Sequence, residues 1–302
     1  FCIRFTVTHK SIAAQYTQQT NSYSAKTGRK EVIMAIIKGA FQMTGSIRGV
    51  SFYSMRGSDK TIMRTKGGAS KNKIKTSPKF EGLRNHQKEW AGCTSFGSTA
   101  RYALGGLHRL ADYNLTPVLN GMAKNLMKLD TESEVGMRRL NLSAFPQALE
   151  NFNFNRKNPF NSVLRVTVPC RIDCEKLCAV VEIPRINALN DIYNYQQLPY
   201  FRIIVAMGLL SDMERDDTHS IYKACVPDLH GYSIVQTGAW HPSQSILQPE
   251  LIRIEFDEKD CVYVNERVTI LLSMGIEFGK VGFTGEPEAM KYAGSAKVIA
   301  VG

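Results

Sequence analysis

The chain has 302 residues, of which 43% are hydrophobic and 22% are charged. This is the composition of a globular protein, and it excludes a collagen, a coiled coil and a wholly disordered chain. No run of about 18 apolar residues occurs, so the sequence predicts no membrane-spanning helix. A chain of this length usually forms two domains, which is what we expect here.

The charges are distributed unevenly along the chain. Residues 1–160 carry 25 basic and 9 acidic side chains, a net charge of +16, whereas residues 161–302 carry 13 basic and 18 acidic ones, a net −5; the two add up to +11. A basic half attracts anions such as nucleic acid, acidic lipid or the acidic surface of a partner. The alternative is that these lysines and arginines only solvate the surface.

The first 33 residues differ from the rest of the chain. Residues 11–24 are rich in Gln, Thr, Ser and Asn, and Met34 is the first methionine. The sequence Arg29–Val32 can be encoded by purine-rich RNA that resembles a bacterial ribosome-binding site. We therefore expect translation to begin at Met34, with residues 1–33 as an over-called leader. The alternative is a genuine disordered tail.

Cysteine usage indicates a reducing compartment. The number of cysteines is odd and their spacing is scattered, unlike a disulfide framework: Cys2, Cys93, Cys170, Cys174, Cys178, Cys225 and Cys261. The N-terminus has no cationic stretch followed by an apolar run and a cleavage site, so no signal peptide is evident. We expect a cytoplasmic or virion-associated protein.

A hairpin and a basic arm are predicted after Met34. Strand-forming residues at 47–53 and 61–64 flank the turn-forming sequence Arg56–Asp59, which predicts a hairpin at about 46–65. Residues 66–75 are rich in lysine and have almost no apolar side chain to bury. We expect them to form an exposed, mobile arm.

Helices are predicted next. Ser77-Pro78 is typical of a helix start, and Phe80, Leu83 and Trp90 fall on one face of that helix. Further helical patterns are predicted at 98–113, weakened by two glycines, at 117–129 and at 143–152. The Asn-rich residues 151–159 are interpreted as a linker.

From residue 162 onward the apolar pattern alternates with a period of two. The expected strands include residues 164–168, 177–183, 201–205, 221–226, 232–240, 252–256, 262–264, 268–274 and 296–301. Because no long helical pattern separates them, we expect an antiparallel sandwich or barrel rather than parallel βαβ units.

Several residue clusters suggest a metal site or a catalytic site but lack the features that such a site requires. Cys170, Cys174 and Cys178 lack the two-residue spacing and the fourth ligand of common metal sites, so a hairpin without metal is expected. The acidic residues at 212–217, with His219, lack the glycine and the closing glutamate of a calcium loop. Asp228, His230 and His241 have no nucleophile signature beside them. The sequence therefore predicts no catalytic residue, no metal and no cofactor.

The strongest functional signal is basic. Seven basic residues and no acidic one occur in residues 60–79, close to two aromatic residues. Lysines neutralise phosphates, and aromatic rings can stack on bases. The predicted anion- or partner-binding residues are Lys60, Arg64, Lys66, Lys71, Lys73, Lys75, Lys79, Phe52 and Tyr53. The alternative is an arm that packs on a neighbouring subunit or that serves solubility alone.

Gly45–Val50, Arg64–Lys66 and Ser77–Phe80 together resemble the opening of a family of uncharacterised proteins in Bacteroidota genomes. In those proteins a glycine-punctuated hairpin is followed by a basic, proline-containing stretch, a helix and a β-rich region. The likeness covers residues 34–90 and, more loosely, the Asn-rich junction. The resemblance implies no established activity, and it favours a bacterial or mobile-element origin.

The sequence thus predicts an α+β protein with three parts: a leader at 1–33, a basic hairpin, arm and small helical bundle at 34–155, and an antiparallel β-sandwich at 161–302. The expected function is that of a non-enzymatic binding or assembly protein, for example a structural component of a phage-like or surface assembly. Its partner would be a protein or another copy of the chain. The alternatives are a nucleic-acid-binding protein that uses residues 60–79 and a hydrolase that uses the β half.

Overall fold

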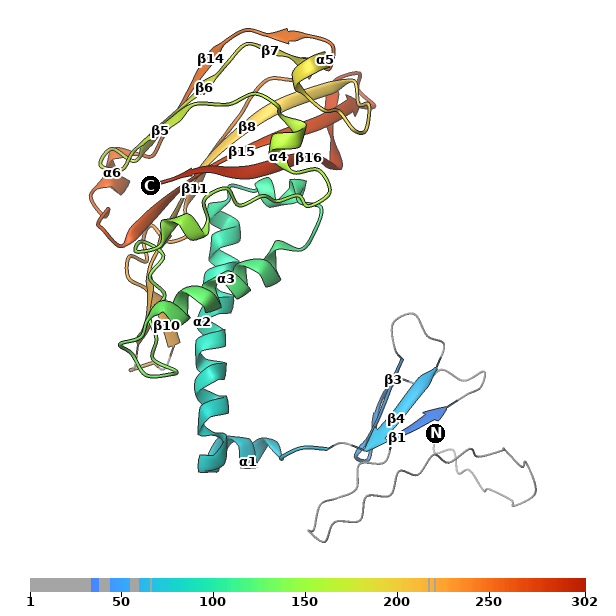
Figure 1. Ribbon diagram of the computed structural model, residues 1–302, viewed down its shortest axis with the longest axis vertical. Coiled ribbons are helices and arrows are strands. Elements are labelled where there is room, and N and C mark those ends of the chain that lie inside the picture. Colours follow the sequence, from blue (N-terminus) through green and yellow to red (C-terminus); the bar gives the residue numbers. More distant parts are fainter. Residues whose placement is uncertain (1–33, 38–43, 55–59, 66, 217, 220) are drawn as a thin grey trace, which may run out of the picture. The chain divides into compact units, whose positions relative to one another are not determined.

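The computed structural model describes residues 34–37, 44–54, 60–65, 67–216, 218–219 and 221–302 (Figure 1). The expected leader, residues 1–33, lies outside the described part. The chain divides into two compact units, residues 1–71 and 72–302, which are described separately. The α+β class is confirmed, because helices are combined with antiparallel sheets and the C-terminal half is rich in strands.

The described part of the N-terminal unit is a four-stranded antiparallel sheet. Its strands stand in the order β1-β4-β3-β2: β1 Met34–Ile37, β2 Gly45–Ile47, β3 Val50–Ser54 and β4 Thr61–Thr65. The expected pairing is present, since β3 pairs with β4 from Val50↔Thr65 to Ser54↔Thr61. The expected turn at 56–59 lies outside the described residues.

The single strand predicted at 47–53 is wrong. Arg48 and Gly49 have φ angles of 43° and 88°, and they form a tight turn that separates β2 from β3. Two consecutive residues with positive φ are what a two-residue hairpin loop of type I′ requires, and glycine adopts this conformation without strain.

The arm predicted at 66–75 is partly helical. Lys71–Thr76 forms the short helix α1, and the 3₁₀ helix η1 follows at Pro78–Phe80. Arg84 stabilises this helical backbone, because its Nη1 atom donates hydrogen bonds of 2.8 Å to the carbonyl oxygens of Ile74 and Ser77. No residue of α1 is buried, which agrees with the expected exposure of this part of the arm.

One long helix replaces the first two predicted ones. Helix α2 spans Glu81–Ala103, and it ends where Gly105 and Gly106 adopt φ angles of 59° and 74°. The apolar face predicted for it is wrong, since Leu83 and Trp90 are 43% and 48% exposed. The face that packs inward carries Cys93, Phe96 and Ala100, together with small residues around them.

The third predicted helix is confirmed as α3, Leu115–Leu129, which the side chain of Asn114 caps by accepting from the amide of Thr116. The fourth is wrong, because only the 3₁₀ turn η3 at Pro146–Ala148 forms there. The 3₁₀ helix η2 spans Leu107–Leu110. The short helices are α4 Phe160–Val163, α5 Ala188–Asp191 and α6 Glu258–Cys261.

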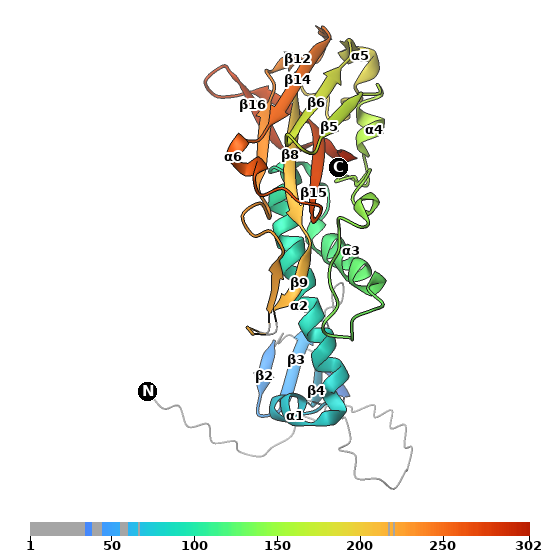
Figure 2. The same cartoon turned by 90° about the vertical axis from the view of Figure 1, so that its left-hand side faces the viewer.

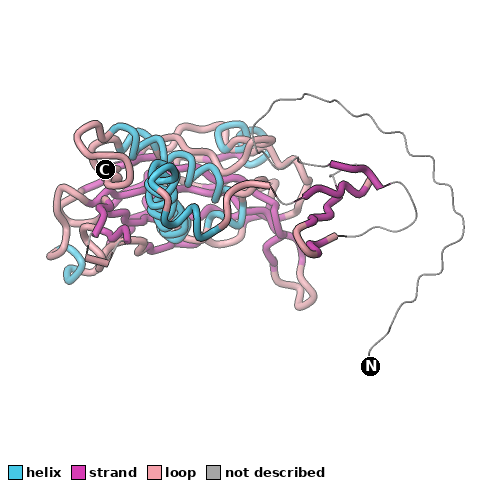
Figure 3. Tube along the Cα trace, turned by 90° about the horizontal axis from the view of Figure 1, so that it is seen from below, coloured by secondary structure: helices cyan, strands magenta, loops and turns pink. Residues whose placement is uncertain are grey.

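Strands make up most of the regular structure of the C-terminal unit (Figure 3). The larger sheet has the order β11-β8-β15-β16, with β12 also paired to β8: β8 Tyr200–Ser211, β11 Ser233–Thr237, β12 His241–Pro242, β15 Val268–Val281 and β16 Pro287–Val301. The smaller sheet, seen in Figure 2, has the order β14-β6-β5: β5 Cys170–Asp173, β6 Cys178–Ile183 and β14 Glu250–Glu255.

Two small strand pairs complete the unit: β9 Met213–Asp216 with β10 Ile221–Ala224, and β7 Ile186–Asn187 with β13 Ile246–Leu247. Two of the predicted strands are wrong. Residues 164–168 form no strand, since only Leu164 makes an isolated bridge, to Ile192. Residues 262–264 follow α6 without strand pairing.

The two sheets pack face to face, and helices cover the outer face of the larger one. In β8, Ile203, Val205 and Met207 point into the core between the sheets, whereas Ile204 and Ala206 belong to a second core beneath α2 and α3. Both faces of β8 are therefore buried, which explains its nearly continuous apolar sequence. The predicted sandwich is thus backed by a helical layer.

The helices and the β half share this second core, so residues 72–302 form one unit. The expected linker, residues 151–159, packs as part of this unit. Phe154 is fully buried, and its amide donates to the carbonyl of Ala296 at 2.9 Å. The Asn155 side chain donates to Leu110 and Gly294. The contacts thus join the parts that the sequence analysis separated between 155 and 161.

A buried carboxylate ties the helical layer to the larger sheet. Glu277 on β15 accepts two hydrogen bonds from Arg109, at 2.9 and 3.2 Å, and a further one from Arg202 at 2.8 Å. The Arg202 guanidinium also lies 4.4 Å from the centre of the Trp240 ring. Burial raises the pKa of Glu277, but the two arginines outweigh burial and leave that pKa below its usual value.

Candidate anion-binding surface

Eight of the nine predicted binding residues lie in the described part of the chain. Phe52, Tyr53 and Arg64 are in the N-terminal sheet, and Lys60 immediately precedes β4. The other four follow the sheet, in α1 and η1: Lys71, Lys73, Lys75 and Lys79. Lys66 lies outside the described residues.

The strand register separates the two aromatic residues. Tyr53 pairs with Ile62, and Ser51 pairs with Arg64, so these four residues share one face of the sheet. Phe52 pairs with Met63 on the opposite face. The Arg64 guanidinium lies 5.3 Å from the centre of the Tyr53 ring. Tyr53 and Arg64 thus form a cation–π pair, and Phe52 does not belong to the same surface.

The lysines of α1 and η1 are all exposed. Residues 71 and 75 are one helical turn apart, whereas residue 73 points to the other side of α1. Residues 34–80 contain ten basic residues and one acidic residue, Asp59. This excess attracts polyanions, and the spread of the lysines around α1 does not define a pocket for a small anion.

The cysteine and acidic clusters predicted to lack a metal lie in separate parts of the described structure. Cys170, Cys174 and Cys178 lie on the β5–β6 hairpin, as predicted. The residues that the structure describes contain no group of three or more His, Cys, Asp or Glu side chains able to hold a metal ion. In the acidic loop, Asp216 pairs with His219 and Lys223, whereas Asp212 is buried elsewhere.

The histidines have structural contacts. His241 packs against Phe201, with ring centres 5.8 Å apart. His230 accepts a 3.1 Å hydrogen bond at Nδ1 from the amide of Ser211, and it lies beside Phe96. Burial lowers the pKa of His230 to about 4, which favours the neutral ring that this hydrogen bond needs.

We expect this histidine to make the protein sensitive to mild acid. Below pH 6.5 the unfolded chain binds a proton at His230 and the folded chain does not, so stability is lost as the pH falls from about 6.5 to about 4. Between pH 7 and pH 5 the loss should be about 2 kcal/mol. Urea unfolding at the two pH values measures it. His230→Asn, which keeps an acceptor for Ser211, should remove most of the difference; an unchanged difference would contradict this assignment.

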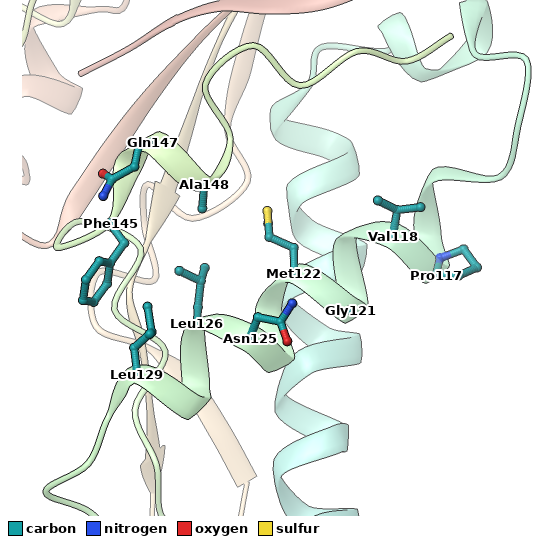
Figure 4. A pocket seen from close by; sticks show the side chains of 10 residues that line it. All are labelled: Pro117, Val118, Gly121, Met122, Asn125, Leu126, Leu129, Phe145, Gln147 and Ala148. Carbon is teal, nitrogen blue, oxygen red and sulfur yellow. The ribbon is translucent and has the colours of Figure 1, made fainter. Parts of the chain in front are cut away.

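Two hollows were not foreseen from the sequence. An apolar groove of about 580 Å³ lies between α3 and η3, lined among others by Met122, Leu126 and Phe145 (Figure 4). A polar cavity of about 350 Å³ is lined by residues that include Ser143, Asp212 and Cys225. Asp212 accepts from the Ser143 hydroxyl at 2.6 Å. The residues that line the polar cavity are far apart in the sequence, so no local sequence pattern could have predicted that they lie together.

The apolar groove carries no charge among its lining residues, and the polar cavity combines acidic with basic side chains. Neither hollow therefore has the excess of basic side chains that residues 60–79 have. No helix of the described residues is long and apolar enough to cross a membrane. Comparisons with protein-family models, curated proteins and solved structures found no match, so the resemblance to Bacteroidota proteins stays a prediction.

Proposed function

We propose that this chain is a non-enzymatic binding and assembly protein whose basic segment, residues 60–79, contacts an anionic partner. The observation that carries the proposal is that the five lysines described in this segment are all exposed, in a stretch with seven basic residues and no acidic one. Arg84 supports it further, because it holds the carbonyl of Ile74 in α1 and that of Ser77 just after it, which reduces the chain entropy that a partner would have to overcome. The six cysteines of the described residues are free, which supports action in a reducing compartment.

Replacing Lys71, Lys73 and Lys75 together by Gln should weaken binding to polyanions. With duplex DNA as the probe, the slope of log K against log salt should fall by up to about three units if all three lysines meet phosphates. The melting temperature should hardly change, because exposed charges contribute little to stability. Fluorescence anisotropy at several salt concentrations measures the binding, and size-exclusion chromatography shows whether oligomers are lost.

The matched control replaces three exposed lysines of the β half, Lys176, Lys259 and Lys291, by Gln. It changes the net charge equally, so it should leave the salt slope almost as in the natural chain. If both triple variants bind every polyanion equally and form the same oligomers, the basic segment is not the contact element and the proposal fails.

A further inference from the structure

We propose that the sheet face with Tyr53 and Arg64 is a stacking platform for single-stranded nucleic acid. This inference rests on the proposed function, because it identifies the anionic partner and adds a second contact to the lysines. The platform consists of four residues from β2, β3 and β4, around the buried Ile62: Ser46, Ser51, Tyr53 and Arg64.

The register determines which side chains form this platform. The pairs Tyr53↔Ile62, Ser51↔Arg64 and Ser46↔Ser51 project to the same side of the sheet. Tyr53 is 36% exposed, and Arg64 is exposed as well. The Arg64 guanidinium therefore lies over the Tyr53 ring, 5.3 Å from its centre, so the outer side of this cation–π pair is what a base could stack on.

This combination matches the chemistry of an unpaired nucleotide. A base can stack on a tyrosine ring or on a guanidinium plane, and the guanidinium also neutralises a neighbouring phosphate. The hydroxyls of Ser46 and Ser51, 3.3 Å apart, add donors and acceptors on the same side. An acidic peptide would use the positive charge but would leave the exposed ring without a matching partner.

The surrounding charge favours a polyanion over a neutral aromatic ligand. Residues 34–71 contain seven basic residues and one acidic residue, a net charge of +6. A single strand is favoured over a duplex, because the faces of duplex bases are already stacked on one another and cannot reach a ring on a sheet.

The test uses the full chain with two labelled probes, an oligothymidylate and inorganic polyphosphate. Tyr53→Ala should weaken binding to the oligothymidylate about tenfold, as expected for one lost stacking contact. It should leave polyphosphate binding unchanged, because polyphosphate has no base. Tyr53→Phe should bind within about twofold of the natural chain, and Tyr102→Ala, at an exposed tyrosine of the C-terminal unit, should have no effect.

A cross-linking measurement on the natural chain guards against a misfolded variant. An oligonucleotide with 5-iodouracil should cross-link on irradiation to Tyr53, identified by peptide mass spectrometry. Cross-links found only elsewhere would overturn the inference, as would equal oligothymidylate binding by Tyr53→Ala or duplex binding tighter than single-strand binding. If polyphosphate still binds in a lysine-dependent way in any of these cases, the proposed function survives; if neither probe binds, this inference falls, and the proposed function is decided by the oligomers of the triple lysine variant.

Discussion

Gly208→Ala should lower the free energy of unfolding by about 3 kcal/mol or more, as a steric clash in a packed core. A Cβ atom at position 208 would lie 1.8 Å from the carbonyl oxygen of Ala103 and 2.6 Å from its carbonyl carbon. These are backbone atoms at the end of α2, so no side-chain rotation can relieve the clash. The close packing continues just after α2, where a Cβ at Gly105 would lie 2.5 Å from Ala206, so the clash can be relieved only if the backbone at the end of α2 moves away from β8.

Urea unfolding, followed by circular dichroism, measures this effect. Gly121→Ala on α3 is the control, because no atom lies within 4 Å of the added Cβ. There the change should stabilise the protein by about 0.5–1 kcal/mol, since alanine loses less chain entropy than glycine in a helix. If Gly208→Ala unfolded at the same urea concentration as the natural chain, α2 would not contact β8 as the structure has it.

Glu277→Ala is expected to cost about 3–5 kcal/mol, as is typical when one partner of a buried ion pair is removed. The variant leaves the guanidinium of Arg202, whose side chain is only 22% exposed, without its carboxylate. It also releases Arg109, and with it the tie between η2 and the sheet. The measurement is again the free energy of unfolding at neutral pH.

Glu255→Ala provides the comparison, since Glu255 also pairs with an arginine, Arg253, at 2.7 Å. Its side chain is 55% exposed, so the expected cost is below about 1 kcal/mol. The pKa of Glu277 is lowered, so the stabilisation that it provides should be lost as the pH falls below about 4.5. Equal costs for the two variants would show that the Glu277 cluster is hydrated.

The alternating strands could be predicted because their two faces differ in the sequence. The segment at 252–256 shows this, since Ile252 and Ile254 are buried in β14 while the residue between them is exposed; in β15, by contrast, the polar Thr269 is buried as well. Residues 164–168 have the same alternation without a strand. There Val166 and Val168 pack partly buried against the core, and Pro169 has no amide to continue a ladder. The alternation of apolar residues therefore indicates which side chains face the core, but a segment forms a strand only if its backbone also pairs with another strand.

The packing face of α2 could not be predicted from hydrophobicity, because small residues make its closest contacts. A Cβ on Gly92 would lie 2.6 Å from the Tyr222 ring, and one on Gly97 would lie 2.0 Å from the Asn120 side chain. Glycine contributes almost nothing to an apolar pattern, although it allows this close approach. Leu83 and Trp90, which dominate the pattern, are instead half exposed.

The residue composition of the candidate binding surface could be predicted from the sequence, but its geometry could be predicted only in part. A run of basic residues without acidic ones is visible in the sequence, and its exposure follows from the lack of apolar side chains. The hydrogen bond that Arg84 donates to Ile74 in α1 comes from ten residues further along the chain, and no propensity rule links the two. The pairing of Tyr53 with Arg64 depends on the register between β3 and β4.

Arg84 also governs how easily the basic segment can be cut. Proteases bind their substrates as extended backbone, so a lysine within a helical turn is cleaved only while that turn is open. One guanidinium holds two carbonyl oxygens, those of Ile74 and Ser77, on either side of the peptide bond that follows Lys75. The rate of tryptic cleavage at Lys75 therefore tracks the fraction of time for which Arg84 lets this turn unwind.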